Sequence, residues 1–302
     1  MAESDLSWVL GSLLALVLVL GIVLRRGTAR VHAELQQLRL LQVQHPGAES
    51  AHRQALLAGL QQELEIARQM QRSILPRNPL HAPGVQVDAV MEPASEVGGD
   101  FYDYFLVDEN RLALVVADVS GKGIPAAFFM AVSRTLLKSL ALLLRDPVRV
   151  MTQLNAQLAA ENEPMMFVTV FFCVLDLRTG TLDFVNAGHN PPVIRAAGGQ
   201  VRMLPRNQNM ALGVNEHLRL RAGRAVLRPG DTLLLYTDGI VEAGDPLGRM
   251  FGEQRLLEAV LRYPGGAQSL PLALLREVRS FEGGRPQADD ITCVALRLIP
   301  VD

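Results

Sequence analysis

The chain has 302 residues, 49% of them hydrophobic, and a formal net charge of -2 at pH 7. This length is enough for one domain of roughly 200–250 residues with a sizeable core and some chain left over. The charge excludes the strong basic excess that is typical of nucleic-acid-binding proteins, so we expect no nucleic-acid partner. Cys173 and Cys293 lie in apolar, strand-like runs, which predicts two reduced core residues and no disulfide framework.

The first segment of the chain is apolar. Residues 6–24 carry no charge and are mostly Leu, Val, Ile and Ala, and as a helix they would just cross a hydrocarbon core of about 30 Å. Arg25 and Arg26 follow, so the positive-inside rule places the rest of the chain in the cytoplasm. A cleaved signal peptide is the alternative, but the basic segment that begins such peptides is missing. We therefore expect residues 1–26 to be a single-pass anchor in the cell membrane.

Residues 27–79 are rich in Gln, Leu, Glu, Arg and Ala, which favours a helical linker, and Pro46-Gly47 divides it in two. In the second piece, positions alternately three and four apart form a stripe like that of a short coiled coil. The stripe predicts either a homodimer through residues 57–74, which would transmit a signal from the membrane, or an amphipathic helix packed on its own domain. Its members are Leu57, Leu60, Leu64, Ala67, Gln71 and Ile74.

Residues 80–302 contain apolar runs of strand length that mostly follow one another through short turns. This pattern indicates an α+β domain, with largely antiparallel sheet and helices packed on its faces. The expected strands are 85–91, 111–119, 167–176, 182–187, 193–195, 217–227, 232–237 and 291–299. The expected helices are 125–144, 148–161, 254–263 and 270–281.

Four acidic positions share one local pattern, a carboxylate at the end of an apolar strand or beside glycine. Each is weak evidence alone, because Asp-Gly is also a common turn. Together they would crowd negative charge at one rim of a sheet, and divalent cations usually compensate such crowding. Oxygen ligands without a His or Cys cluster suit Mg²⁺ or Mn²⁺ better than Zn²⁺. The four positions are Asp100 within segment 96–103, Asp118, Asp238-Gly239 and Asp289-Asp290.

Six motifs occur in a fixed order along the chain. They are Glu-Leu-Glu-Ile-Ala-Arg-Gln-Met-Gln-Arg-Ser-Ile-Leu-Pro (63–76), Gly-Gly-Asp-Phe-Tyr-Asp (98–103), Ala-Asp-Val-Ser-Gly-Lys-Gly-Ile-Pro (117–125), Asn-Ala-Gly-His-Asn-Pro-Pro (186–192), Tyr-Thr-Asp-Gly (236–239) and Asp-Asp-Ile-Thr (289–292). They resemble the SpoIIE-type branch of the PPM metal-dependent serine/threonine protein phosphatases, over about residues 63–299.

The resemblance implies that residues 80–302 form a four-layer αββα sandwich with a two-metal site at one edge. It implies hydrolysis of phosphoserine or phosphothreonine by a water that two Mn²⁺ or Mg²⁺ ions share, about 3.5–4 Å apart. Bacterial members often act on phosphorylated anti-anti-sigma factors with STAS domains. By motif, Asp118 would bridge both ions and the carbonyl of Val119 would complete the second. Asp238 and Asp289 would hold the first ion, and Asp100 would bind metal-held waters.

Some roles stay open. Asp290 is expected beside the ligand Asp289, but the two could exchange roles. Segment 91–95 holds no arginine for phosphate, in contrast to better-known PPM branches, so phosphate would depend mainly on the metals. No general acid is evident: His189 lies in a turn where it more often ties down backbone than donates a proton. Lys122 could attract phosphate, although an exposed loop lysine is the simpler interpretation.

Three functions remain to be compared. The first is a membrane-anchored protein phosphatase whose segment 117–125 responds to the linker. The second is a catalytically inactive module with the same fold, which fits less well because every acidic ligand position is filled. The third is a membrane receptor whose cytoplasmic part only dimerises, which leaves the four acidic strand ends unexplained.

Overall fold

The computed structural model describes residues 46–299, except for 77–79, 83, 161, 163–164, 206–208 and 264–268. The predicted membrane anchor, residues 1–26, and the first part of the predicted linker lie outside the described residues. Contacts divide the chain into two units, Met1–Glu65 and Ile66–Asp302, and both sheets belong to the second.

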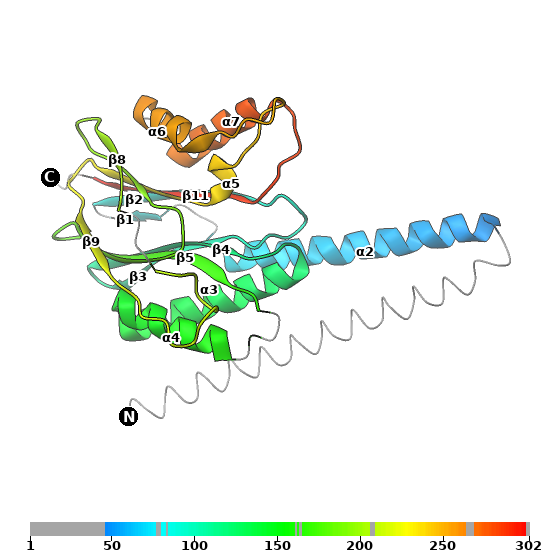
Figure 1. The fold of residues 1–302 in the computed structure, drawn as a ribbon, viewed down its shortest axis with the longest axis horizontal. Helices are drawn as coiled ribbons and strands as arrows, with labels where there is room; N and C mark the ends of the chain where they lie inside the picture. The colour runs from blue at the N-terminus through cyan, green and yellow to red at the C-terminus, as the bar shows by residue number, and fades with distance from the viewer. Residues whose placement is uncertain are drawn as a thin grey trace. The chain divides into compact units, whose positions relative to one another are not determined.

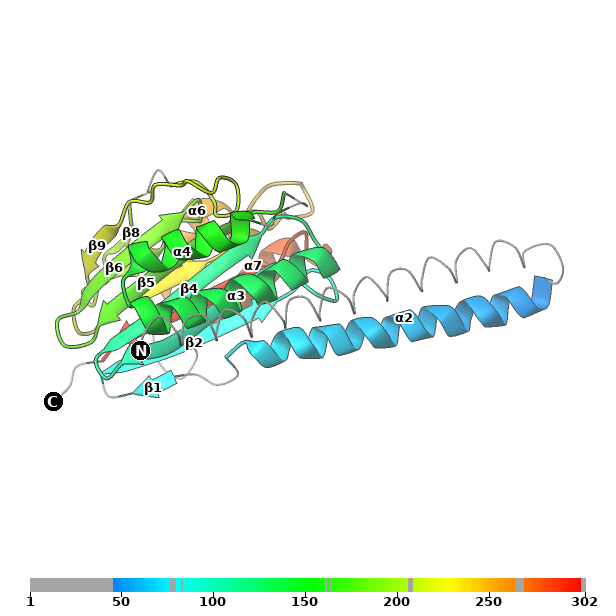
Figure 2. The same cartoon turned by 90° about the horizontal axis from the view of Figure 1, so that it is seen from below.

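The first sheet is antiparallel and has six strands, in the order β1-β2-β11-β10-β7-β8 (Figures 1 and 2). Its last strand in sequence, β11, is central and pairs with β2 on one side and β10 on the other. Strands β10 and β11 are almost entirely apolar because both of their faces are covered. The strands are β1 Leu80–Ala82, β2 Val85–Glu92, β7 Val193–Arg195, β8 Val201–Met203, β10 Thr232–Tyr236 and β11 Ile291–Leu298.

The second sheet is also antiparallel and has five strands, in the order β3-β4-β5-β6-β9. Strand β4 lies between β3 and β5, and its run of buried Leu, Val and Ala fills the middle of the sandwich. The strands are β3 Phe101–Asp108, β4 Arg111–Val119, β5 Val168–Asp176, β6 Thr181–Ala187 and β9 Gly223–Val226.

Helices cover the outer faces of both sheets, which gives the predicted four-layer αββα sandwich (Figure 1). Helices α3 (Ile124–Leu144) and α4 (Pro147–Ala160) contact the second sheet, while α6 (Gly252–Arg262) and α7 (Leu270–Glu282) contact the first. The larger core lies between the sheets and under α3 and α4, and a smaller one lies under α6 and α7. Cys173 and Cys293 are buried and free, as predicted.

Several elements differ from the expectation. Strand β3 was not predicted, because its acidic residues resemble a loop. Strand β9 covers only the end of the expected strand 217–227, and the three-residue strands β1 and β8 were not predicted. The Asp-Gly pair at 238–239 opens the short helix α5 (Asp238–Val241) and makes no hairpin turn.

Two helices bear on the membrane and linker predictions. Among the described residues, α3 alone is long and apolar enough to cross a membrane, but it packs on β3, β4 and α4 as an outer helix of the sandwich. Helix α2 (Pro46–Ile74) begins at the proline that was expected to divide the linker. Leu57 and Leu60 of its stripe are exposed, whereas Gln71 is buried.

Candidate metal centre

Asp118 lies at the end of β4, between strands β3 and β5. Its backbone is opposite Thr169 of β5, and the preceding Ala117 pairs with Phe101, the first residue of β3. Asp100 immediately precedes Phe101, so this pairing brings Asp100 and Asp118 to the same edge of the second sheet. The side chain of Asp100 is almost fully buried, with 1% exposed.

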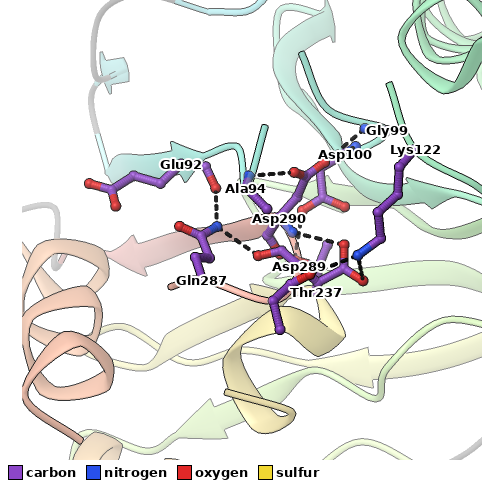
Figure 3. Close-up of polar contacts among 10 residues, drawn as sticks. Glu92, Ala94, Gly99, Asp100, Lys122, Thr237, Gln287, Asp289 and Asp290 are labelled. Atoms are coloured by element: carbon purple, nitrogen blue, oxygen red, sulfur yellow. Dashed lines mark hydrogen bonds and ion pairs between the residues drawn. The ribbon is translucent and has the colours of Figure 1, made fainter. Parts of the chain in front are cut away.

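The first sheet brings its acids to this edge as well. The end of β10 meets the start of β11, where the Thr237 amide donates to the Thr292 carbonyl at 3.0 Å. Asp238 follows β10 and Asp289 precedes β11, so the antiparallel pairing places them near each other. The Thr237 hydroxyl also donates to Asp100 Oδ2 at 2.8 Å, which joins the two sheets (Figure 3).

These carboxylates are close enough to raise each other's pKa. Burial raises the pKa of Asp118 to about 7, and repulsion from Asp238, Asp289 and Asp290 adds to it. Burial, with Asp118 and Asp290 as neighbours, raises the pKa of Asp100 well above its usual range. Burial raises the pKa of Asp238 too. The predicted acids therefore do converge, and they form a site that bound cations would stabilise.

The donor set fits a hard divalent cation. Among the described residues, no three His, Cys, Asp or Glu side chains surround one point closely enough to hold an ion by themselves. Mg²⁺ and Mn²⁺ accept backbone carbonyls and waters beside carboxylates, so waters would complete the coordination of an ion that Asp118, Asp238 and Asp289 do not surround closely enough by themselves. The Val119 carbonyl is the expected ligand of this kind: a Cβ added to Gly99 would lie 2.8 Å from its oxygen, so this glycine keeps side-chain atoms away from it.

The adjacent aspartates 289 and 290 point in different directions (Figure 3). Asp290 points inward: its Oδ1 accepts from the Ala94 amide at 2.8 Å, and its Oδ2 accepts from the amides of Gly99 at 2.8 Å and Asp100 at 3.4 Å. Asp289 is 44% exposed at the rim of the site. The exposure of Asp289 favours it as the metal ligand, whereas the hydrogen bonds of Asp290 hold the loop 93–100 in place.

Two glycines are required by this packing. A Cβ on Gly98 would lie 2.1 Å from Asp290 Oδ2, and a Cβ on Gly239 would lie 2.0 Å from the Asp290 carbonyl oxygen. Any larger residue would displace the loop or α5. Both glycines therefore serve the close approach of Asp290 to its neighbours.

His189 ties the two sheets together behind the acids. Its Nε2 lies 3.1 Å from the Tyr236 carbonyl oxygen, which can only accept, so Nε2 carries the proton. Its Nδ1 lies 2.8 Å from the Thr169 hydroxyl and accepts from it. Asn186 closes the turn by bonding both the amide and the carbonyl of His189. Burial lowers the pKa of His189 to about 4, so the ring is neutral near pH 7. These bonds favour the structural role.

Lys122 extends from the turn after β4 to the opposite sheet. Its ammonium donates to the Ala288 carbonyl at 2.7 Å and lies 3.1 Å from Asp289 Oδ2 (Figure 3). The lysine thus contacts a proposed ligand directly, which its sequence position in a glycine-flanked turn did not reveal.

Sequence reasoning missed three polar residues of this region. Thr237 stands inside a recognised motif, but nothing in the sequence indicates its bond to Asp100. Gln71 was assigned to the helical stripe, yet its side chain bonds the loop at Gly98. Gln287 Nε2 donates to the carbonyls of Glu92 at 2.8 Å and Asp289 at 2.6 Å, and no sequence signal marks it.

Comparison with known proteins identifies a family and several relatives of this chain. The family described as Stage II sporulation protein E (SpoIIE) matches residues 108–299. Protein IcfG of Synechocystis sp. (strain ATCC 27184 / PCC 6803 / Kazusa) is 33% identical over 261 residues, which are 78% of this chain and 41% of IcfG. Phosphoserine phosphatase RsbP of Bacillus subtilis (strain 168) is 30% identical over 184 residues, 60% of this chain and 45% of RsbP. The chain thus spans less than half the length of these two relatives.

Solved structures share the fold. The SiaA-PP2C domain of Pseudomonas aeruginosa superposes with a TM-score of 0.69 at 24% identity, covering 81% of this chain and 99% of that domain. RsbX, solved in complex with magnesium, superposes with a TM-score of 0.56 at 15% identity over 73% of this chain and 98% of RsbX.

Proposed function

The chain belongs to the SpoIIE family, and from this membership we propose that it is a metal-dependent protein serine/threonine phosphatase. The observation that carries the proposal is the convergence of Asp100 and Asp118 from one sheet with Asp238 and Asp289 from the other, where burial and neighbouring carboxylates raise the pKa values of Asp100, Asp118 and Asp238. RsbP and RsbU of Bacillus subtilis, both similar to this chain, are named phosphoserine phosphatases.

The proposed ligands are Asp118, the Val119 carbonyl, Asp238 and Asp289, with Asp100 bonded to metal-held water. When bound, two Mn²⁺ or Mg²⁺ ions supply Lewis acidity, which lowers the pKa of water and offsets the negative charge of a phosphoryl group. The chain itself orients this edge: Thr237 fixes Asp100 by a hydrogen bond of 2.8 Å.

Hydrolysis of p-nitrophenyl phosphate and of a phosphoserine peptide tests the proposal. Turnover should require Mn²⁺ or Mg²⁺, stop with a chelator, and fall at least about 100-fold in Asp118→Asn and Asp238→Asn, because each change removes a charged ligand. A folded protein without turnover that still binds a phosphoprotein would instead support the inactive module.

The substrate we propose is a phosphorylated regulatory protein of the anti-anti-sigma, STAS-like type. The resemblance of the six motifs to the SpoIIE-type branch supports this choice. Phosphoproteomics of a deletion strain should show the substrate as a protein whose serine phosphorylation rises.

We also propose that the chain is held at the cell membrane by residues 1–26, with the phosphatase domain in the cytoplasm. The uncharged run 6–24 followed by arginines supports the anchor. The full chain should stay with membranes through an alkaline carbonate wash, and a variant without residues 1–26 should be released. Release of the full chain by the wash would contradict the anchor.

A homodimer through residues 57–74 is the proposed link between anchor and enzyme. Leu57, Leu60 and Ile66 of α2 are 41–51% exposed, which is the exposure that a partner helix could cover. Deleting residues 1–55 and measuring metal-dependent turnover tests the coupling, and unchanged turnover would argue against it.

A further inference from the structure

Lys122 lies in the turn between β4 and α3. Gly121 and Gly123 on either side of it have φ angles of 89° and 74°, which glycine adopts without strain. The ammonium group lies 2.7 Å from the Ala288 carbonyl oxygen and 3.1 Å from Asp289 Oδ2. The lysine therefore connects the two sheets at the rim of the acidic edge, from a turn flanked by two glycines.

This ion pair contributes little to the fold. The side chains of Lys122 and Asp289 are 58% and 44% exposed, and water screens pairs at such exposure. The chain has only one other lysine, Lys138, which does support the fold. Its ammonium lies 3.3 Å from the buried Asp103 and 4.7 Å from the centre of the Phe105 ring.

Lys122 supplies the positive charge at an otherwise acidic edge. Of the basic residues that the structure describes, Lys122 is the one that forms an ion pair with a proposed acidic ligand, Asp289. Segment 91–95, just before the first acidic motif, holds no Lys or Arg. Among the described residues, Lys122 is therefore the cation that a phosphate dianion at Asp289 would meet through this ion pair.

We propose that Lys122 binds the phosphate group of the substrate. The inference rests on the phosphatase function proposed above and identifies the protein group that recognises its substrate. A divalent cation held by Asp289 would offset the charge of that carboxylate and weaken its attraction for the ammonium, which would keep its hydrogen bond to the Ala288 carbonyl. The lysine is a point charge with three donors on a flexible stem, so it can turn from the carboxylate to the phosphoryl oxygens.

Steady-state kinetics on the full chain test this role. In Lys122→Met, the KM for a phosphoserine peptide and the inhibition constant of inorganic phosphate should both rise about ten- to hundredfold, as expected for loss of one charge-assisted hydrogen bond. The value of kcat should change less than KM. Lys122→Arg keeps the charge and should recover most of the loss, and Arg149→Met, which removes an exposed cation from α4, serves as the matched control.

Metal affinity is the second measurement, because it separates phosphate binding from support of the metal ligand. Removing the ammonium removes a competitor for Asp289. Calorimetric titration should therefore show that Lys122→Met binds Mn²⁺ at least as tightly as the unmodified chain. Weaker Mn²⁺ binding would mean that Lys122 positions the ligand, and it would overturn the proposal.

Because the chain has two lysines, NMR can detect directly whether phosphate binds near Lys122. Reductive ¹³C-methylation keeps the positive charge and labels Lys122 and Lys138, whose signals are assigned with Lys122→Arg. With Mg²⁺ present, inorganic phosphate should shift the Lys122 signal and leave that of Lys138 in place.

The outcomes separate the two proposals. An active enzyme whose KM, phosphate inhibition and Lys122 signal do not respond would overturn the role of Lys122 alone. A chain without turnover whose Lys122 signal still shifts with phosphate would overturn the phosphatase function and retain the phosphate site.

Discussion

Gln71 and Gly98 exchange two hydrogen bonds: Gln71 Nε2 donates to the Gly98 carbonyl at 2.6 Å, and the Gly98 amide donates to Gln71 Oε1 at 3.1 Å. Gln71 belongs to the last turns of α2, and Gly98 belongs to the loop that precedes Asp100. Asp290 binds the same loop from its other side through the Gly99 amide. Two hydrogen bonds thus connect the last turns of α2 to the loop that precedes Asp100, a proposed site residue.

Gln71→Ala should weaken both the fold and the site. It leaves the amide and carbonyl of Gly98 without their buried partner, which should lower the free energy of unfolding by about 1–3 kcal/mol. Because the freed loop carries Asp100, the Mn²⁺ concentration for half-maximal activity should rise. Thermal unfolding and metal titration measure the two effects. Gln62→Ala, at an exposed position of the same helix, is the control. If Gln71→Ala and Gln62→Ala had the same stability and the same Mn²⁺ requirement, the hydrogen bonds between Gln71 and Gly98 would not support the site.

Asp289→Asn should mainly reduce metal affinity, whereas Asp290→Asn should mainly reduce stability. Asp290 accepts from three backbone amides, so its change should lower the free energy of unfolding by about 1–3 kcal/mol. Asp289 is at the rim, so its change should leave stability nearly intact and reduce Mn²⁺ affinity at least about tenfold. Calorimetry and denaturant unfolding measure both. If Asp290→Asn lost metal affinity at unchanged stability, the assignment of the two aspartates would be reversed.

The raised pKa of Asp118 makes the stability of the metal-free protein depend on pH. Its pKa is about 7 in the folded chain and 3.8 in its unperturbed state, so the folded chain holds the proton more tightly. The resulting stabilisation is complete below pH 4 and is lost as the pH rises to about 7. His189 acts in the opposite direction between pH 4 and 6.5, because its pKa is lowered. The comparison must therefore be made against Asp118→Asn.

In the presence of a chelator, the free energy of unfolding of Asp118→Asn minus that of the unmodified chain should increase from pH 4 to pH 7. Urea unfolding at pH 4, 5, 6 and 7 measures this difference. A difference that does not change with pH would mean that Asp118 is ionised throughout the range.

His189 should act through structure and not through proton transfer. His189→Ala should lower the free energy of unfolding by about 2–4 kcal/mol, because it removes two hydrogen bonds and leaves a cavity. His189→Gln can still donate to the Tyr236 carbonyl and should recover part of that loss. If His189 donated a proton to the leaving group, removing it would abolish the alkaline limb of the pH profile of kcat. We expect that profile to keep its shape in His189→Gln.

Local signals in the sequence allowed an antiparallel α+β fold and the meeting of the acids to be predicted, and the resemblance of the motifs implied the αββα sandwich. Apolar runs mark β4, β10 and β11, and each proposed acidic ligand stands at the end of such a run. Asp118 and Asp238 could be found in this way. Strand β3 was missed because its pattern is acidic and aromatic, and only its pairing with β4 shows it to be a strand.

The orientation of side chains within the site could not be predicted. Asp289 and Asp290 are neighbours of one type, and only the folded loop 93–100 supplies the amides that draw Asp290 inward. Gln71 fits the helical stripe by its spacing, and its partner Gly98 is 27 residues away. Such long-range bonds follow from tertiary packing and leave no periodic signal in the sequence.

Strand β11 is both late in the sequence and central in its sheet, between β2 and β10. During synthesis on the ribosome, β2 and β10 emerge without the strand that joins them, and Asp289 emerges only just before it. The nascent chain therefore cannot assemble the proposed metal centre until β11 has left the exit tunnel, and a chain cut by a protease before Asp289 loses the central strand of the sheet and a proposed ligand together.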